Sequence, residues 1–213
     1  CNAADFESVG NSDYIRINAN VINELNDFTI SVWGKTANSS NQTILSGANA
    51  SVFNEALMFF TAGNKFKPSL NNSQAPELTI TAINDDNWHH LVWTRLETDN
   101  CLYIDGVAQG CISHPIGQLA IENLILGQEQ DSNGGSFDAD EGWEGLIDEL
   151  TIFDGAIGAS AVTSIYDNQL AGKNWDGTLR SSSCTAAWWP LENDFLDVSV
   201  SNPHNLIPFN SPV

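Results

Sequence analysis

The sequence predicts an all-β fold, a sandwich of two antiparallel sheets, with one short helix near residues 160–170. Short segments alternate apolar and polar residues, as half-buried strands do. Stretches rich in Asn, Ser and Gly separate these segments, a pattern typical of sandwiches and barrels. At 213 residues the chain fits a single domain, because many β-sandwiches of this length fold as one unit.

The strand signals follow one another along the chain. Residues 28–33 (Phe-Thr-Ile-Ser-Val-Trp) alternate most clearly and predict a half-buried strand. Residues 38–41 and 71–73 are rich in Asn and Ser and predict turns. Further strands are predicted at 55–60, 78–83, 91–94, 102–104, from 107 onward, and at 145–153.

A hairpin is predicted where Asp105-Gly106 lies between two apolar segments, since this dipeptide is a strong turn signal. With a two-residue turn, Cys101 would face Gly110, one residue short of Cys111. A bulge or a longer loop would bring the two cysteines within disulfide range. We therefore expect a disulfide that joins the two strands of this hairpin.

The four cysteines form an even set, and none lies in a CxxC pair. This argues against a zinc or thioredoxin-like site and fits two disulfides in an oxidising compartment. With Cys101 and Cys111 paired, Cys1 is expected to pair with Cys184. An alternative stays open for Cys1, because bacterial lipoproteins are acylated on a first-residue cysteine, which would leave Cys184 unpaired.

The predicted helix has Val162, Ile165, Tyr166 and Leu170 at helical spacing. Ser160 stands just before this pattern and is expected to cap the first turn.

The chain is strongly acidic, with 7 basic and 27 acidic side chains and a net charge of −20. Such a surface repels nucleic acid and anionic lipid and attracts cations, although solubility alone would also explain much of the charge. No apolar run approaches the ~18 residues that a membrane span needs. No signal peptide is visible, so we expect a mature or trimmed chain that is secreted or displayed at the cell surface.

The acidic residues gather most densely between positions 129 and 141, where no Lys or Arg accompanies them. So many like charges in one loop are costly unless a cation neutralises them. Calcium takes about six to eight oxygen ligands, mostly carboxylates, carbonyls and water. Two adjacent glycines would allow the sharp turns that bring the carboxylates together. The alternative is a solvated acidic loop. The acidic residues are Glu129, Asp131, Asp138, Asp140 and Glu141.

Several segments resemble known families. Residues 126–137 (Leu-Gly-Gln-Glu-Gln-Asp-Ser-Asn-Gly-Gly-Ser-Phe) closely resemble the calcium loop of pentraxins. Residues 88–94 and 101–106 resemble the central signature of laminin-G-like domains, and 145–153 resemble their closing strand. The resemblance covers about residues 12–170 and implies a concanavalin A-like jelly roll.

The pentraxin resemblance implies two neighbouring calcium ions and assigns ligands to them. Glu129 and Asp131 match the residues that bridge both ions, and Gln130 matches a ligand that contributes its backbone carbonyl. Asp138 stands where the family has an acidic ligand, and Glu141 replaces a Gln. The resemblance therefore predicts one or two calcium ions at these residues.

Two further positions of the family pattern bear on the ligand side of this site. The upstream Asp-Asn pair aligns with Phe53 and Asn54, of which only Asn54 can ligate a metal. Phe59 aligns with an apolar contact beside the ligand, although a core position on a strand would also explain it. Trp143 lies next to the acidic loop and is a second candidate contact, as a stacking surface for a sugar.

The two ends of the chain depart from the family order. Residues 187–192 (Ala-Trp-Trp-Pro-Leu-Glu) resemble the opening strand of laminin-G-like domains, yet they come last. We expect residues 1–213 to form one sandwich in which 185–213 supply the usual first strand in permuted order. Alternatively, the chain was cut from a tandem array and its tail begins the next repeat. Termini that lie close together would permit either arrangement.

The predicted function is a calcium-dependent, lectin-like extracellular binding module that recognises a glycan or similar polar ligand. A role in cell-surface adhesion is part of this expectation. A structural repeat of an adhesin or filament, in which calcium only stiffens the fold, is the first alternative. Homo-oligomers or tandem-repeat neighbours are the expected protein partners, and no nucleic acid or membrane span is expected.

An enzyme, such as a polysaccharide hydrolase or lyase, is the less favoured alternative. Glu144, Asp148 and Glu149 superficially suggest the paired carboxylates of a glycosidase cleft, but alternation puts Glu144 and Asp148 on one face and Glu149 on the other. The same segment also resembles the non-catalytic closing strand of laminin-G-like domains. His89 and His90 are adjacent on a strand and point to opposite faces, with no carboxylate–His–Ser set in view.

Overall fold

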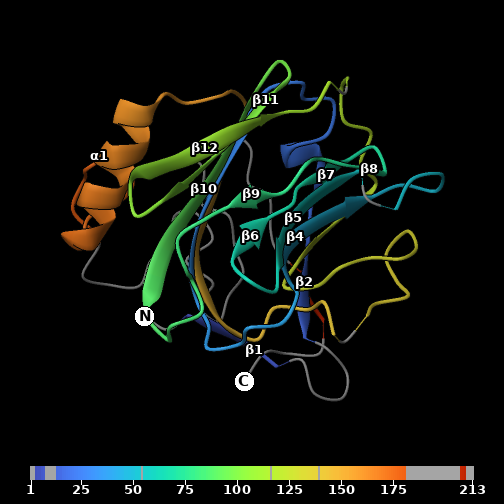
Figure 1. Cartoon of the computed structure of the whole chain (residues 1–213), viewed down its shortest axis with the longest axis horizontal. Coiled ribbons are helices and arrows are strands. Elements are labelled where there is room, and N and C mark those ends of the chain that lie inside the picture. The colour runs from blue at the N-terminus through green and yellow to red at the C-terminus, as the bar shows by residue number, and fades with distance from the viewer. Residues whose placement is uncertain are drawn as a thin grey trace.

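The computed structural model describes residues 3–7, 13–53, 55–115, 117–138 and 140–180, and the backbone of 207–209. Two antiparallel sheets lie against each other, and the one α-helix among the described residues lies on the outer side of one sheet (Figure 1). The predicted all-β sandwich with one short helix is confirmed.

The first sheet, called sheet A, contains the hairpin and the predicted closing strand. Its central strands are paired antiparallel over most of their length, with Trp93 opposite Ile30 on one side and Leu102 on the other. In spatial order the strands are β1 (Ala4–Phe6), β14 (Gly145–Phe153), β3 (Phe28–Lys35), β10 (Trp88–Leu96), β11 (Asp99–Ile104) and β12 (Val107–Ser113).

The second sheet, called sheet B, carries the strands that support the acidic loop. In spatial order its main strands are β15 (Ile207–Phe209), β2 (Tyr14–Ile17), β13 (Asn123–Leu126), β4 (Gln42–Ala48), β5 (Ala56–Thr61), β6 (Lys65–Phe66) and β9 (Leu78–Thr79). Beside this row, β7 (Ser69–Leu70) pairs with β5 and with β8 (Ser73–Gln74). A 3-10 helix, Ala19–Val21, follows β2.

The core fills the space between the sheets. Trp93 is fully buried at its centre, and the rings of Phe28 and Phe66 meet it edge-on at centroid distances of 4.9 and 5.8 Å. Each such aromatic pair contributes roughly 0.5–1.5 kcal/mol beyond the burial of its area. Alternate residues of the main strands point inward and form this core, which is the larger of two hydrophobic clusters among the described residues.

The helix α1 (Ala159–Leu170) covers the outer face of sheet A (Figure 1). Val162 of this helix packs against Val92 and Tyr103. Two details of the prediction are wrong. Gly158, with no side-chain bond, is the N-cap instead of Ser160. Leu170 is exposed, and Gln169 takes the buried position in the last turn.

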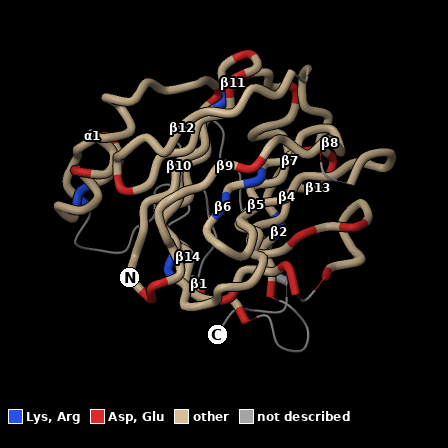
Figure 2. Tube along the Cα trace, in the orientation of Figure 1, with Lys and Arg blue, Asp and Glu red and all other residues tan. Residues whose placement is uncertain are grey.

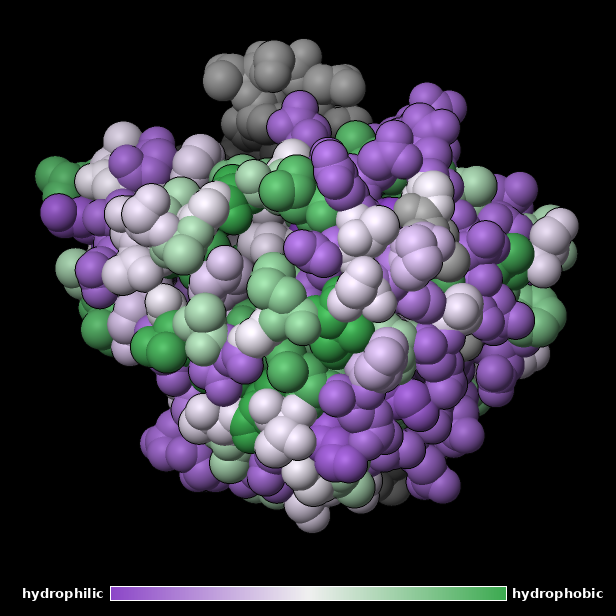
Figure 3. Space-filling view, turned by 45° about the horizontal axis from the view of Figure 1, so that its top comes forward, coloured by the Kyte–Doolittle hydropathy of each residue, from purple (hydrophilic) through white to green (hydrophobic). Residues whose placement is uncertain are grey.

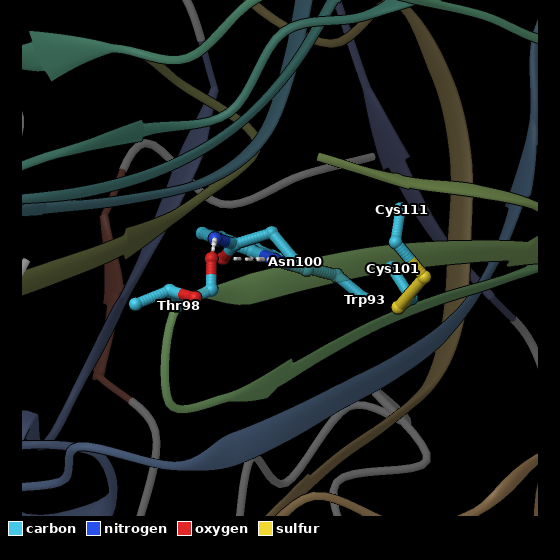
Figure 4. Close-up of a disulfide and its surroundings, with 5 residues drawn as sticks. All are labelled: Trp93, Thr98, Asn100, Cys101 and Cys111. Carbon is cyan, nitrogen blue, oxygen red and sulfur yellow. Dashed lines mark hydrogen bonds between the residues drawn. A yellow bond between two sulfur atoms is a disulfide. The ribbon is translucent and has the colours of Figure 1, made fainter. Parts of the chain in front are cut away.

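The predicted hairpin disulfide joins Cys101 on β11 to Cys111 on β12 (Figure 4). The two residues are direct partners in the ladder, because a bulge after Leu102 adds one residue to β12. The predicted bulge is therefore confirmed. Next to Cys101 on β11, Asn100 accepts a hydrogen bond of 3.1 Å from the Trp93 indole and ties the hairpin to the core.

A short strand of the tail, β15, pairs antiparallel with β2 at the edge of sheet B, with Pro208 opposite Ile15. Cys1, Cys184 and the segment 187–192 lie outside the described residues. The second disulfide and the permuted order of the sandwich stay predictions.

The surface carries both grouped and isolated hydrophobic side chains. Figure 3 shows a face where hydrophobic residues gather near the centre and hydrophilic ones cover its right side. Isolated exposed hydrophobic side chains are normal on folded proteins. Among the described residues the large ones come from different parts of the fold: Phe53, Trp88, Leu96, Val107, Leu170 and Leu179.

Candidate metal site

The acidic loop leaves β13 and crosses the outer face of sheet B before the chain enters β14 (yellow at the right of Figure 1; Asp and Glu are red in Figure 2). Its neck is closed by two backbone bonds: Gly127 N–H to Ile44 O at 2.7 Å, and Trp143 N–H to Gly127 O at 2.9 Å. Gly127 has φ +86°, and a Cβ there would lie 2.3 Å from the Phe6 ring, so the neck needs glycine.

Buried amide side chains hold the first part of the loop. The Gln130 amide nitrogen donates to the Ser46 carbonyl at 2.9 Å and to the Ser46 hydroxyl at 3.0 Å. The Gln130 side-chain oxygen accepts from Gly134 N–H at 2.9 Å, and the Ser46 hydroxyl donates to the Gln128 carbonyl at 2.6 Å. The loop is thus fixed to β4 on both sides of Glu129.

Glu129 is the most unusual carboxyl group of the loop. It is 2% exposed, and its Oε2 atom is buried with no hydrogen-bond partner. Burial raises the pKa of Glu129 from 4.5 to about 8, and the charges of Asp131, Glu141 and Asp138 add to the rise. An ionised Glu129 is therefore costly in this position unless a cation accompanies it.

The other carboxylates face the same region. Burial raises the pKa of Glu141, and nearby Asp138 and Asp131 add to this rise, against a hydrogen bond from Asn41 that lowers it. Asp131 and Asp138 are exposed. Asp138 Oδ1 accepts a hydrogen bond of 2.9 Å from Asp140 N–H, which turns the chain back toward Glu141.

The structure brings four of the predicted ligands within electrostatic reach of one another: Glu129, Asp131, Asp138 and Glu141. Asn54, the predicted ligand from the loop between β4 and β5, lies outside the described residues. In the described part of the chain, no three His, Cys, Asp or Glu side chains are arranged to hold a metal ion as they stand.

The donor set nevertheless fits calcium. The four side chains that the structure brings together offer carboxylate oxygen, the hard ligand that calcium prefers, and none of them offers sulfur or nitrogen. The buried Glu129 Oε2 lacks the hydrogen bond that a buried carboxylate ordinarily has. The four mutually repelling charges would favour a divalent cation between them.

Trp143 and Phe59, the two residues predicted to contact a bound ligand, are both buried, but they lie in different places. Trp143 is 1% exposed, belongs to the core and donates from its indole to Leu146 O at 3.3 Å. It offers no stacking surface, so that prediction is wrong. The Trp143 side chain points into the core because its backbone N–H is bonded to Gly127 O at the neck of the loop. Phe59 lies on β5 opposite Thr43, which bridges Gly142, but it is only 8% exposed.

The acidic residues considered for catalysis have structural partners. Glu144 accepts a hydrogen bond of 2.9 Å from Asn38. Glu149 sits at a bulge with φ +53°, is 3% exposed, and pairs with Arg180 and with Gln169 beneath α1. These contacts explain the buried Glu149 as an anchor for the helix and the segment that follows it.

The two histidines point to opposite faces, as predicted. His89 lies between Asp105 and Asp85, at 2.8 and 3.1 Å. His90 Nε2 lies 2.8 Å from the Ser31 hydroxyl, but His90 Nδ1 is buried without a hydrogen-bond partner, and burial lowers the pKa of His90 to about 4. A carboxylate–His–Ser arrangement is therefore not formed here.

Sequence reasoning missed the residues that support the loop from a distance. Ser46 lies 84 positions before Gln130, and Asn41 lies 100 positions before Glu141. Neither is part of a motif, and only the pairing of β4 with β13 brings Ser46 to the loop.

Solved structures share the fold. A heptameric SAP-like pentraxin from Limulus polyphemus matches with a TM-score of 0.66 at 19% identity, covering 77% of this chain and 81% of that one. Domains LG4-5 of the mouse laminin α1 chain match with a TM-score of 0.58 at 13% identity, covering 75% of this chain and 44% of that one.

No helix in the described ranges has the length and apolar character of a membrane span.

Proteins with similar sequences include a C-reactive protein and a neuronal pentraxin receptor. Rattus norvegicus C-reactive protein is 28% identical over 174 residues, which cover 79% of this chain and 74% of that protein. The Homo sapiens neuronal pentraxin receptor is 32% identical over 151 residues, covering 67% of this chain but only 29% of the receptor. A model of the Pentaxin family matches residues 2–177, well over half of the sequence, and the chain therefore belongs to this family.

Proposed function

We propose that this chain is a calcium-dependent extracellular binding domain that holds a polar ligand, such as a glycan, beside the acidic loop on sheet B. The observation that carries the proposal is Glu129, a buried carboxyl group with an unpartnered oxygen and three further carboxylates around it. A buried glutamate with a purely structural role would have hydrogen-bond or ion-pair partners for both carboxyl oxygens, whereas Glu129 receives a backbone hydrogen bond from Gln130 and leaves Oε2 unpartnered.

The proposed ligands are the side chains of Glu129, Asp131, Asp138 and Glu141 and the backbone carbonyl of Gln130. Asn54 would join them if a second ion binds. Bound calcium would supply a centre of positive charge to which hydroxyl, carboxylate or phosphate oxygens of a ligand can coordinate. The protein would hold its own carboxylate and carbonyl oxygens on one side of the loop, where they can bind the ion.

The metal part of the proposal is tested by calorimetry and thermal unfolding with calcium and with chelator. Millimolar calcium is expected to raise the melting temperature, since an ion that binds only the folded state adds about 4 kcal/mol at ~1,000 times its dissociation constant. Asp131→Ala should remove most of this effect, because Asp131 contributes to the field at both Glu129 and Glu141.

Asp140→Ala serves as the matched control. Asp140 is an exposed aspartate of the same loop and is outside the proposed ligand set, so its loss should leave most of the calcium effect. The proposal fails if calorimetry detects no calcium binding at physiological concentration, or if Asp131→Ala melts with the calcium dependence of the parent.

A second candidate function is a structural repeat in which calcium only stabilises the fold. Phe53 favours it, because an exposed phenyl ring stands where the family pattern has an acidic ligand. Binding to a glycan array with and without chelator separates the two candidates: ligand capture that calcium restores supports the binding domain, and calcium-dependent stability without capture supports the structural repeat. Light scattering of the same samples tests for the predicted homo-oligomer.

A further inference from the structure

We propose that Gln130 and Ser46 are positioning residues for the calcium loop: their side chains form a buried strut that holds Glu129 and Asp131 in place before any ion binds. The inference rests on the calcium-binding function proposed above and adds two side chains, neither of which contacts the ion through its side chain.

The geometry of the strut is specific. The Gln130 side chain is completely buried, and both ends of its amide are used: the nitrogen on Ser46 of β4, the oxygen on Gly134 N–H. The same nitrogen lies 3.4 Å from the Asn123 carbonyl at the start of β13. One side chain thus connects two strands of sheet B to the turn of the loop.

Ser46 contributes from the sheet side. Its hydroxyl donates to the Gln128 carbonyl at 2.6 Å and accepts from the Gln130 amide at 3.0 Å. Gln128 in turn accepts from Glu129 N–H through its side-chain oxygen at 2.8 Å. The residues before and after Glu129 are therefore both bound to one serine on a central strand.

The hydrogen bonds of the strut keep the acidic loop ordered against the repulsion between its own charges. Without a cation, an ionised Glu129 is repelled by the charges of Asp131, Asp138 and Glu141, and this repulsion favours an open loop. An open loop would have to be ordered when calcium arrives, which costs conformational entropy and weakens binding. Groups that orient metal ligands are typically worth about 10- to 100-fold in metal affinity.

The test compares two variants of the full chain with two controls. Gln130→Met keeps the size of the side chain and removes both hydrogen-bonding ends, and Ser46→Ala removes a single hydroxyl. Gln169→Met and Ser69→Ala make the same changes at buried Gln and Ser residues away from the loop, in the last turn of α1 and on β7. The probe is calcium alone, titrated by calorimetry.

A second readout needs no calcium. The Gly134 amide hydrogen is bonded to Gln130 Oε1, so its exchange with solvent in chelator should be faster in Gln130→Met than in the parent. Ser46→Ala, which changes fewer atoms, decides the matter if Gln130→Met does not fold.

The expected result is calcium binding weakened by about tenfold or more in Gln130→Met and Ser46→Ala, with the controls equal to the parent. If the parent binds calcium and both variants bind it as tightly, the strut is overturned and the proposed function stands. If weakening appears equally in the controls, the effect is general destabilisation and the strut is likewise overturned. If the parent itself binds no calcium, the proposed function fails and the strut fails with it.

Discussion

Replacing Glu129 with Gln is expected to stabilise the protein in chelator and to remove most of its stabilisation by calcium. Gln has nearly the shape of Glu and carries no charge. In the structure the Glu129 carboxyl is 2% exposed, and its pKa is raised from 4.5 to about 8 by burial and by its acidic neighbours. The substitution therefore removes a charge that the folded protein disfavours.

The size of the effect follows from proton linkage. Between pH 4.5 and 8 the folded protein holds a proton on Glu129 that the unfolded chain releases. Because the folded state binds more protons in this window, stability falls as pH rises through it. Each pH unit above 4.5 costs about 1.4 kcal/mol, so at pH 7 the cost is about 3 kcal/mol. For a chain of this length that equals roughly 6–12 °C in melting temperature.

The assay is thermal unfolding of parent and Glu129→Gln from pH 5 to 9, once in chelator and once in millimolar calcium. In chelator the variant should melt higher, by a margin that grows up to about pH 8. In calcium the order should reverse. Glu97→Gln, at the exposed turn between β10 and β11, is the control and should follow the parent. A variant that melts lower than the parent in chelator, or that calcium stabilises as strongly, would refute the reasoning.

Three further predictions concern the rest of the fold. Replacing Cys101 and Cys111 by Ser should cost about 2–3 kcal/mol in urea unfolding, the value for a ten-residue loop, and an unchanged midpoint would contradict it. His89→Gln should destabilise more at pH 6 than at pH 9, since its aspartate partners raise the pKa of His89 and its contribution is lost as pH rises through that value; equal losses would exclude the ion pair. Deleting residues 185–213 should lower the melting temperature by removing β15 from β2; a truncated chain of equal stability would show that the tail belongs elsewhere.

The agreement between sequence and structure is best where a local pattern decides the conformation. β3 and β14 contain the predicted strands, because alternation of apolar and polar residues favours extended backbone. The prediction that 28–33 is half-buried is wrong, since residues 28–32 of β3 are all buried. β4 was not predicted, since its seven residues are all buried and show no alternation. The predicted strand at 78–83 shortens to Leu78–Thr79, at the edge of sheet B, where few neighbours extend the pairing.

The candidate site divides in the same way. The sequence alone identifies the acidic residues of the loop, because their charges are crowded within a few positions of one another. It does not identify Glu129 as the buried member, since exposure depends on how the loop folds back over sheet B. The inward turn of Trp143 has the same origin: a residue next to a binding loop can lie in the core when the neck of that loop is closed by backbone bonds.

What the sequence by itself determined is therefore local: strand alternation, the Asp105-Gly106 turn with its disulfide, and the charge of the loop. What only the tertiary structure decided is which distant groups meet these features, as Ser46 meets Gln130 and Arg180 meets Glu149. The physical reason is that hydrogen bonds and ion pairs act over a few ångströms, and in an antiparallel sandwich residues far apart in the chain become neighbours only through strand pairing and sheet packing.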